Sequence, residues 1–197
     1  MNGILLAGGL SVRMGKDKRD LPWNDQTLLT RALSNMQTFC QKVWVVVHDK
    51  EKFKSLNTSK GVAVTQDIFP QRSALCGIFT GLIHSETQWN FAQPCDMPFV
   101  SPDLMRRLAA LASDDLDWIL PSYRSRLQPL CALYSKECIP VMEDALRKGK
   151  CKIIDLRTKL RTRVVPYKEI SHYDREGKSF MNVNTPKDYE RAHAQRH

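Results

Sequence analysis

Short runs of apolar residues alternate along this chain with longer segments in which apolar residues recur every three or four positions. The strand-like runs lie at residues 4–7, 43–47, 62–64 and 91–92, and the segments with helical spacing lie at 28–36, 50–56 and 75–83. Nearly continuous apolar strands are typical of parallel sheets that are buried on both faces. The repeated strand–helix order therefore predicts a parallel sheet with helices on both sides.

The regular alternation of strand-like and helical segments weakens in the second half of the chain. Ser101 and Pro102 form a typical helix start, a side-chain cap followed by proline, and Thr185 and Pro186 repeat it before a final helix. Strands are expected at 118–120, 130–134 and 164–165, and a helix at 139–146. The polar, basic stretch 122–128 is interpreted as an antiparallel edge or an active-site flap. We predict a three-layer α/β/α sandwich whose sheet is mostly parallel, with an antiparallel strand in the C-terminal half.

Length and charge bound the possible functions. With 197 residues, 42% of them apolar, the chain can bury one sizeable core, so a single domain spanning 1–197 is expected. The formal charge of +9 favours anionic partners such as nucleic acid, acidic lipid or a polyphosphate. The sequence contains no recognisable nucleic-acid motif and no apolar run near the ~20 residues of a membrane span. We therefore expect neither nucleic acid nor a membrane as partner.

The six cysteines show neither a C-x-x-C pair nor zinc-binding spacing with histidine. Several lie in apolar runs, where a free thiol behaves as a small apolar side chain. The N-terminal residues lack the basic start and long apolar stretch of a signal peptide. These features predict a cytoplasmic protein with reduced thiols.

The segment 6–18, which follows the first predicted strand, combines three glycines with several cations. Glycine lets backbone N–H groups approach phosphate oxygens closely, and strings of such amides form anion-binding concavities. Arg13 and Lys18 would offset charge that builds up on phosphates during a reaction. Five residues separate Gly9 from Gly15, and Lys16 is followed by aspartate, so this is neither a Walker loop nor a dinucleotide fingerprint. The segment predicts a loop that cradles a nucleoside triphosphate.

Polar residues also follow other strands of the predicted sheet. Ligands of an open parallel sheet bind beyond the carboxyl ends of its strands, where Asp67, Asp96 and His48 lie. Mg²⁺ usually takes one or two protein carboxylates plus substrate phosphate oxygens, and Asp96 could supply one of them. An ordinary turn is the alternative interpretation for each aspartate. The nucleophile context G-x-S-x-G does not occur in the sequence.

Several segments resemble the motifs of a known family. Residues 6–18 resemble the L-A-G-G-x-S-x-R-M-G-x-D-K signature of nucleotidyltransferases with a Rossmann-like fold. Residues 73–78, 95–98, 128–134 and 180–186 resemble the motifs G-P-L-A-G-I, C-D-x-P, H-P-x-x-A-L-x and F-x-N-[IV]-N-T-P of the MobA-type molybdenum cofactor guanylyltransferases. The first motif is shared by many nucleotidyltransferases, and the later ones point to the molybdenum branch.

The resemblance implies roles for individual residues. The nucleotide contacts would be Leu6, Ala7, Gly8, Gly9, Lys18, Asp67 and Asp96. Asp96 would hold Mg²⁺ and, with Arg13 and Lys18, would be catalytic. Asn182 and Asn184 would lie near the metal and bind the acceptor.

The implied reaction joins GMP from GTP to the terminal phosphate of molybdopterin and releases pyrophosphate. Because the attacking group is already an anion, positioning and charge stabilisation suffice and no strong general base is needed. The N-terminal part, about 1–100, would bind nucleotide, and the C-terminal part, about 101–197, the acceptor, with Arg124, Arg126 and Lys152 as candidate phosphate contacts. Proteins that supply molybdopterin or accept the product would be partners.

Two departures from the family pattern bear on base selectivity. Ser73 and Ala74 replace Gly-Pro, and His48 stands where the family usually has asparagine. Three alternatives therefore stay open. The chain could transfer CMP or act on another phosphate or alcohol acceptor, it could be a non-catalytic nucleotide- or cofactor-binding relative, or, on charge alone, it could bind nucleic acid.

Overall fold

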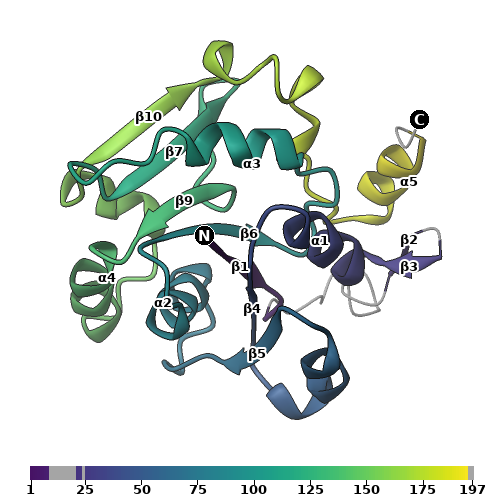
Figure 1. Ribbon diagram of the computed structural model, residues 1–197, viewed down its shortest axis with the longest axis horizontal. Coiled ribbons are helices and arrows are strands. Elements are labelled where there is room, and N and C mark those ends of the chain that lie inside the picture. Colours follow the sequence, from purple (N-terminus) through teal and green to yellow (C-terminus); the bar gives the residue numbers. More distant parts are fainter. Residues whose placement is uncertain (9–20, 24, 195–197) are drawn as a thin grey trace.

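A single eight-stranded sheet runs through the centre of the protein (Figure 1). The computed structural model describes residues 1–8, 21–23 and 25–194. The strands of the sheet are β1 (Asn2–Leu6), β4 (Val43–Val47), β5 (Val62–Gln66), β6 (Trp89–Pro94), β7 (Trp118–Tyr123), β8 (Arg126–Leu127), β9 (Ala132–Ser135) and β10 (Thr162–Pro166). They follow the order β10-β7-β9-β6-β1-β4-β5, and β8 pairs with β7. The short strands β2 (Pro22–Trp23) and β3 (Gln26–Thr27) form a separate hairpin.

The sheet is parallel on its N-terminal side and mixed on its C-terminal side. Strand β1 pairs in parallel with β4 and β6, and β4 pairs in parallel with β5. Strand β9 is antiparallel to both β6 and β7, whereas β10 is parallel to β7. The predicted fold, including an antiparallel strand in the C-terminal half, is confirmed. The basic stretch 122–128 forms the antiparallel pairing of β7 with β8.

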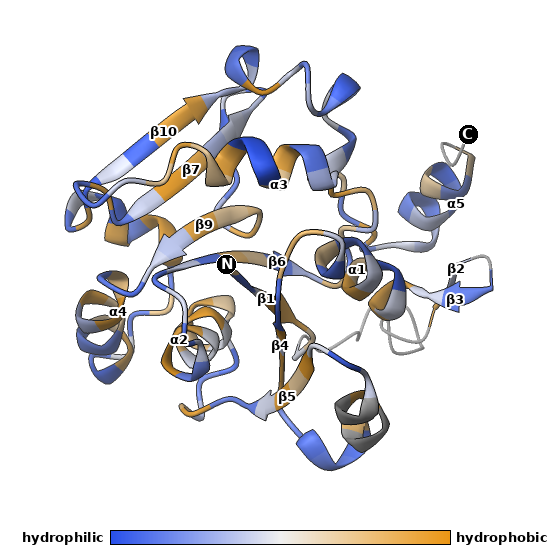
Figure 2. Ribbon diagram, in the orientation of Figure 1, coloured by the Kyte–Doolittle hydropathy of each residue, from blue (hydrophilic) through white to orange (hydrophobic). Residues whose placement is uncertain are grey.

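Helices cover both faces of the sheet, as the continuous apolar strands predict. The helices are α1 (Leu28–Gln37), α2 (Ala74–His84), α3 (Pro102–Ala109), α4 (Cys138–Arg147) and α5 (Pro186–Ala194). One core cluster joins the sheet to α1 and α3, and a second joins it to α2 and α4. Figure 2 shows apolar residues along the central strands and mixed apolar and polar residues around α3 and α4. No helix among the described residues is long and apolar enough to cross a membrane.

The two helix starts predicted from the sequence, at Pro102 and Pro186, are confirmed as the starts of α3 and α5. One segment predicted to be a helix is a 3₁₀ segment instead. The side chain of Ser101 accepts a hydrogen bond from Asp103 N at the start of α3. Residues 50–56, expected to be a short helix, belong to a 3₁₀ segment, η3 (Lys50–Thr58). Its backbone leaves helical geometry at Phe53, which is buried in the core while its neighbours are mostly polar. The described residues also form the 3₁₀ turns η4 (Ile153–Thr158), η5 (Tyr167–Glu169) and η6 (Arg175–Phe180).

An ion pair ties the start of β7 to the segment before β10. Asp117 accepts hydrogen bonds from Arg161 N at 2.8 Å and from Arg161 Nη2 at 2.6 Å, and its side chain is only 9% exposed. Burial alone would raise the pKa of Asp117, but hydrogen bonds and charge from Arg161 outweigh burial and lower it. The ionised pair therefore stabilises the fold above the ordinary pKa of a free aspartate.

We expect Asp117→Asn to lower the free energy of unfolding by about 2 kcal/mol at neutral pH, because it removes the charge from a buried, multiply bonded partner. Denaturant-induced unfolding of the variant and of wild type measures the difference in the free energy of unfolding. The difference from wild type should shrink as the pH falls through the lowered pKa of Asp117 and the carboxylate protonates. Glu143→Gln, which breaks the exposed pair with Arg147, is the control and should cost about 0.5 kcal/mol or less. Equal losses in the two variants would contradict this account.

Candidate functional site

The carboxyl ends of four parallel strands meet at one edge of the sheet. Leu6, the last residue of β1, accepts a hydrogen bond from Cys95 N at 3.1 Å just after β6. Ala7 N donates to Val46 O of β4 at 2.9 Å, and Asp67 N donates to Val47 O at 3.0 Å. These bonds continue the register of the strands into the loops that follow them. The predicted nucleotide contacts Leu6, Ala7, Asp67 and Asp96 are thereby brought to one edge.

Gly8 leaves β1 against the ends of the two neighbouring strands. A Cβ atom built on Gly8 would lie 3.3 Å from Nε2 of His48 and 3.5 Å from Oδ2 of Asp67. A Cβ atom on Gly77, in α2, would lie 2.8 Å from Cδ2 of Leu6 and 3.8 Å from Oδ1 of Asp67. Both glycines therefore permit a close approach of backbone to side chain. Leu6, Gly8, His48, Asp67 and Gly77 form what we call the β1 corner.

The side chains of His48 and Asp67 are in direct polar contact within the β1 corner. Nδ1 of His48 lies 2.6 Å from Oδ2 of Asp67. Burial raises the pKa of the Asp67 carboxyl, and attraction to His48 opposes this rise. The thiol of Cys76, in the first turn of α2, also lies beside this carboxylate. His48 is not among the predicted contacts, although its place at the end of a strand marked the ligand side of the sheet.

Asp96 lies where the N-terminal and C-terminal parts of the chain meet. Its backbone carbonyl accepts a hydrogen bond from Val183 N at 2.9 Å. Val183 is fully buried in a small apolar cluster that contains Leu21, Trp23, Leu28 and Ala192. This anchor holds the flanking residues Asn182 and Asn184 beside the loop that carries Asp96. The structure thus brings the predicted metal residue and the predicted acceptor residues together.

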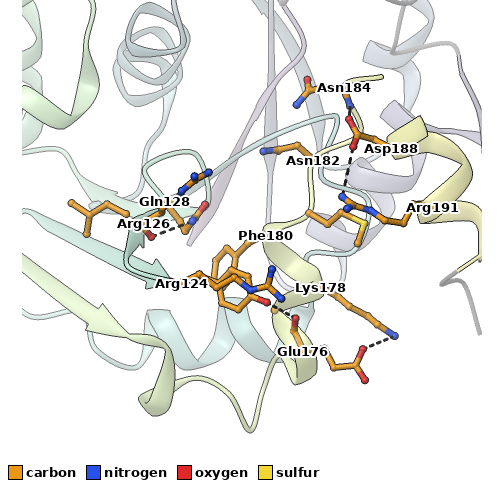
Figure 3. A pocket seen from close by; sticks show the side chains of 14 residues that line it. Arg124, Arg126, Gln128, Glu176, Lys178, Phe180, Asn182, Asn184, Asp188 and Arg191 are labelled. Carbon is orange, nitrogen blue, oxygen red and sulfur yellow. Dashed lines mark hydrogen bonds and ion pairs between the residues drawn. The ribbon is translucent and has the colours of Figure 1, made fainter. Parts of the chain in front are cut away.

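A cavity of about 990 Å³ adjoins Asn182 and Asn184 (Figure 3). It is lined by residues of the β7–β8 hairpin, η6, the segment after η6 and α5. Its cationic side chains are Arg124, Arg126, Lys178 and Arg191. Nζ of Lys178 lies 3.6 Å from a carboxylate oxygen of Glu176, and Nη2 of Arg191 lies 3.6 Å from one of Asp188. Dashed lines in Figure 3 mark both ion pairs. Arg124 and Arg126 have no ion-pair partner among the described residues, so the cavity carries unneutralised positive charge.

One wall of this cavity is fixed by aromatic packing. The hydroxyl of Tyr123 donates to the backbone carbonyl of Glu176 at 2.8 Å, and its ring stacks on Phe180. Gly177 has φ +69°, and a Cβ there would lie 2.2 Å from Cζ of Tyr123. Only glycine fits both this backbone conformation and this contact. The hairpin that carries Arg124 and Arg126 is therefore held in place against η6.

Other residues predicted from the sequence lie elsewhere. Gly9, Arg13 and Lys18 lie outside the described residues. Lys152 is exposed, lies 3.5 Å from Asp155, and is not among the residues that line the cavity. Among the described residues, no group of three or more His, Cys, Asp or Glu side chains could hold a metal ion.

A family model, curated relatives and a solved structure all relate this chain to the same family of proteins. Residues 3–162 match the family described as "MobA-like NTP transferase domain". The chain is 32% identical over 193 residues to a probable molybdenum cofactor guanylyltransferase of Clostridium perfringens, covering 96% of this chain and 94% of that protein. It is 29% identical over 195 residues to the molybdenum cofactor guanylyltransferase of Desulfosudis oleivorans, covering 98% and 95%. The crystal structure of molybdopterin-guanine dinucleotide biosynthesis protein A from Archaeoglobus fulgidus superposes with a TM-score of 0.85 and 26% identity, covering 98% and 96%.

Proposed function

Because the chain belongs to the MobA-like NTP transferase family, we propose that it transfers GMP from GTP to the terminal phosphate of molybdopterin and releases pyrophosphate. The observation that supports this best is the hydrogen bond between Val183 N and Asp96 O. It joins the sheet edge that carries the β1 corner to the cationic cavity beside Asn182. A nucleotide at the first and an anionic acceptor at the second would both lie close to Asp96.

We assign Mg²⁺ to Asp96, with the side-chain oxygen of Asn182 or Asn184 nearby. The donor chemistry fits, because Mg²⁺ prefers oxygen ligands and takes few of them from protein. Asp96 is half-buried two residues after the end of β6, so the fold holds its carboxylate at the edge of the sheet. When bound there, Mg²⁺ supplies positive charge to the nucleotide phosphates.

The residues of the chain position two anions against each other. The acceptor phosphate attacks the α-phosphorus of GTP, a P–O bond forms, and the bond to the leaving pyrophosphate breaks. Arg13 and Lys18 offset the charge that accumulates on pyrophosphate. Leu6, Ala7, Gly8 and Gly9 hold the nucleoside. No side chain has to remove a proton from the acceptor, because the phosphate is already ionised at neutral pH.

The cavity supplies the acceptor site in this proposal. Of the four cations that line the cavity, Arg124 and Arg126 have no ion-pair partner in the part of the chain that the structure describes. Charge-assisted bonds to phosphate are stronger than bonds between neutral groups. Asn182 adds an amide that can donate to a phosphate oxygen. Figure 3 shows these side chains around the open middle of the cavity. The 990 Å³ volume accommodates an acceptor considerably larger than inorganic phosphate.

Pyrophosphate release tests the proposal directly. Purified protein is incubated with Mg²⁺ and GTP, with and without molybdopterin. We expect pyrophosphate and the guanine dinucleotide to form in equal amounts, and only when molybdopterin is present. Release of inorganic phosphate instead of pyrophosphate would contradict nucleotidyl transfer, and a lack of any turnover would favour a non-catalytic binding role.

Gly8→Ala should weaken GTP binding about tenfold. The added methyl group would lie 3.3 Å from the ring of His48, a tight contact, so either His48 or the backbone at the start of the nucleotide loop must shift. A displacement that costs one hydrogen bond corresponds to about a factor of ten. Equilibrium dialysis measures the affinity, and the thermal midpoint checks that the fold is unchanged. An unaltered affinity would show that the nucleotide does not use the β1 corner.

We also place the chain in the reducing cytoplasm. The six cysteines are free thiols, and five of them are buried. Burial raises the pKa of Cys40 and Cys138 to about 12, which keeps these thiols protonated and unreactive. Such thiols are typical of proteins from reducing compartments.

A further inference from the structure

We propose that Asp174 and Ser179 are positioning residues for the acceptor, because together they fix one wall of the acceptor cavity, the cavity that adjoins Asn182, to the loop that carries Asp96. The inference rests on the proposed function and deepens it by naming the groups that keep the acceptor site in shape. Neither Asp174 nor Ser179 lines the cavity or belongs to a segment that resembles a family motif. Both are buried, and their hydrogen bonds join segments that are distant in the sequence.

The side chain of Ser179 links the cavity wall to the loop between Asp96 and α3. Ser179 is fully buried. Its Oγ accepts a hydrogen bond from Ser101 N at 3.0 Å and donates one to the backbone carbonyl of Phe99 at 3.3 Å. The bond from Val183 N to Asp96 O joins the same loop to the chain just beyond. Both ends of this short segment are therefore attached to the Asp96 loop, and the predicted acceptor residue between them depends on both links.

Asp174 holds Ser179 in place. Oδ1 of Asp174 accepts a hydrogen bond from Ser179 N at 3.0 Å. The backbone carbonyl of Asp174 accepts bonds from the hydroxyl of Tyr167 at 2.7 Å and from Gly177 N at 3.3 Å. Its N–H donates to the backbone carbonyl of the fully buried Ile170 at 3.2 Å. The backbone of Asp174 is thereby anchored to the core, and its carboxyl closes the turn that ends at Ser179.

The turn that Asp174 closes has an unfavourable backbone conformation. Glu176 and Gly177 have φ values of 64° and 69°, so two successive residues are left-handed. A left-handed conformation is costly at a residue with a side chain and persists only where the surrounding contacts fix it. The contacts that fix it here are the bond from Ser179 N to the Asp174 carboxyl and the bond from the Tyr123 hydroxyl to Glu176 O. Without the first of these bonds, we expect Glu176 to relax and the turn to change shape.

The same turn supplies side chains to the acceptor cavity. Glu176, Lys178 and Phe180 line this cavity, as Figure 3 shows, whereas Asp174 and Ser179 do not. A change of shape in the turn would therefore alter the surface that is offered to the acceptor and leave the β1 corner untouched. Loss of the Asp174 carboxyl should weaken the binding of acceptor and not the binding of GTP.

The carboxyl of Asp174 is also an expensive group to bury. Its Oδ2 is buried and has no hydrogen-bond partner among the described residues. A buried polar atom without a partner lowers stability. Burial raises the pKa of the Asp174 carboxyl, and hydrogen bonding from Ser179 opposes this rise. Because departures of this kind occur preferentially at functional sites, they favour a positioning role over a purely structural one.

Separate measurements of acceptor and nucleotide binding test the proposal. Affinities for molybdopterin, and for GTP with Mg²⁺, are determined by equilibrium dialysis for wild type, Asp174→Ala, Asp174→Asn and Ser179→Ala. We expect Asp174→Ala and Ser179→Ala to weaken molybdopterin binding about tenfold, the effect of about one hydrogen bond, and to leave GTP binding unchanged. Asp174→Asn keeps an oxygen that can accept the bond from Ser179 N, so it should recover most of the affinity.

Ser85→Ala is the matched control for the loss of a buried hydroxyl. Ser85 is buried and donates a hydrogen bond to Oδ1 of Asn90, near the start of β6 and at the opposite end of that strand from Asp96. The Ser85 variant should lower the thermal midpoint, as the Ser179 variant does, without changing the affinity for molybdopterin or for GTP.

The variants give results that separate the possible outcomes. An unchanged molybdopterin affinity in Ser179→Ala, or a loss of the same size in Ser85→Ala, would overturn the proposal. It would also be overturned if Asp174→Asn bound molybdopterin as weakly as Asp174→Ala, and Ser179→Ala decides the question if Asp174→Ala does not fold. Wild-type protein that binds molybdopterin but forms no dinucleotide would contradict the proposed function and leave this inference intact. Wild-type protein that does not bind molybdopterin would contradict both.

Discussion

Asp96→Asn should reduce the rate of GMP transfer at least a thousandfold while the protein stays folded. The substitution removes the negative charge that we assign to Mg²⁺ and keeps the size of the side chain. A thousandfold loss corresponds to about 4 kcal/mol of transition-state stabilisation, which is the range expected for losing a metal or an electrostatic group at the reacting centre. The backbone carbonyl of residue 96 would still accept the bond from Val183. Steady-state kcat with saturating substrates measures the effect.

Two controls accompany this variant. Asp103→Asn removes an exposed carboxylate that pairs with Arg106 on α3 and should leave kcat unchanged. Removal of divalent cations from the wild-type protein with EDTA should abolish transfer, and added Mg²⁺ should restore it. If Asp96→Asn keeps more than a tenth of the wild-type kcat, the metal must be held by other residues.

Replacement of both Arg124 and Arg126 by alanine should raise the KM for molybdopterin about a hundredfold. Each guanidinium is expected to contribute about a factor of ten through a charge-assisted bond to the acceptor, and the two factors multiply if the bonds are independent. The KM for GTP should not change, because both residues lie in the β7–β8 hairpin beside the cavity and outside the β1 corner. Initial rates at varied molybdopterin concentration and saturating GTP measure the KM for molybdopterin.

Lys152→Ala is the matched control for the arginine pair. It also removes a cation from the C-terminal half, but Lys152 is exposed, lies beside Asp155 and does not line the cavity. The KM for molybdopterin should therefore remain at the wild-type value. If Lys152→Ala and the double arginine variant had the same effect, general surface charge rather than the cavity would attract the acceptor.

Sequence patterns predicted the elements whose burial is continuous or periodic. Strand β4 (Val43–Val47) and helix α2 (Ala74–His84) agree with their predictions within a residue or so, because one is apolar throughout and the other has a clear helical period. The predicted parallel arrangement of the strands placed Asp67 and Asp96 at one edge of the sheet. That edge follows from topology alone, since parallel strands all end on the same side.

Contacts between distant segments could not be predicted in this way. The fit of Gly177 against Tyr123 depends on a left-handed turn in η6 whose sequence carries no strong turn signal. The bond between Nδ1 of His48 and Asp67 depends on the side-chain conformations of two neighbouring strands. The basic stretch 122–128 had two interpretations because two-residue strands such as β8 leave too short a pattern to recognise. In each case the information lies in packing and not in periodicity.

The most direct test of the central claim uses the four ribonucleoside triphosphates, each labelled at the α-phosphate, with molybdopterin and Mg²⁺. We expect label from GTP to enter the dinucleotide product, with much less from ATP, CTP or UTP. Label entering the product from CTP and not from GTP would contradict guanylyl transfer and assign the chain to cytidylyl transfer. Product formation from none of the four would contradict the enzymatic role itself.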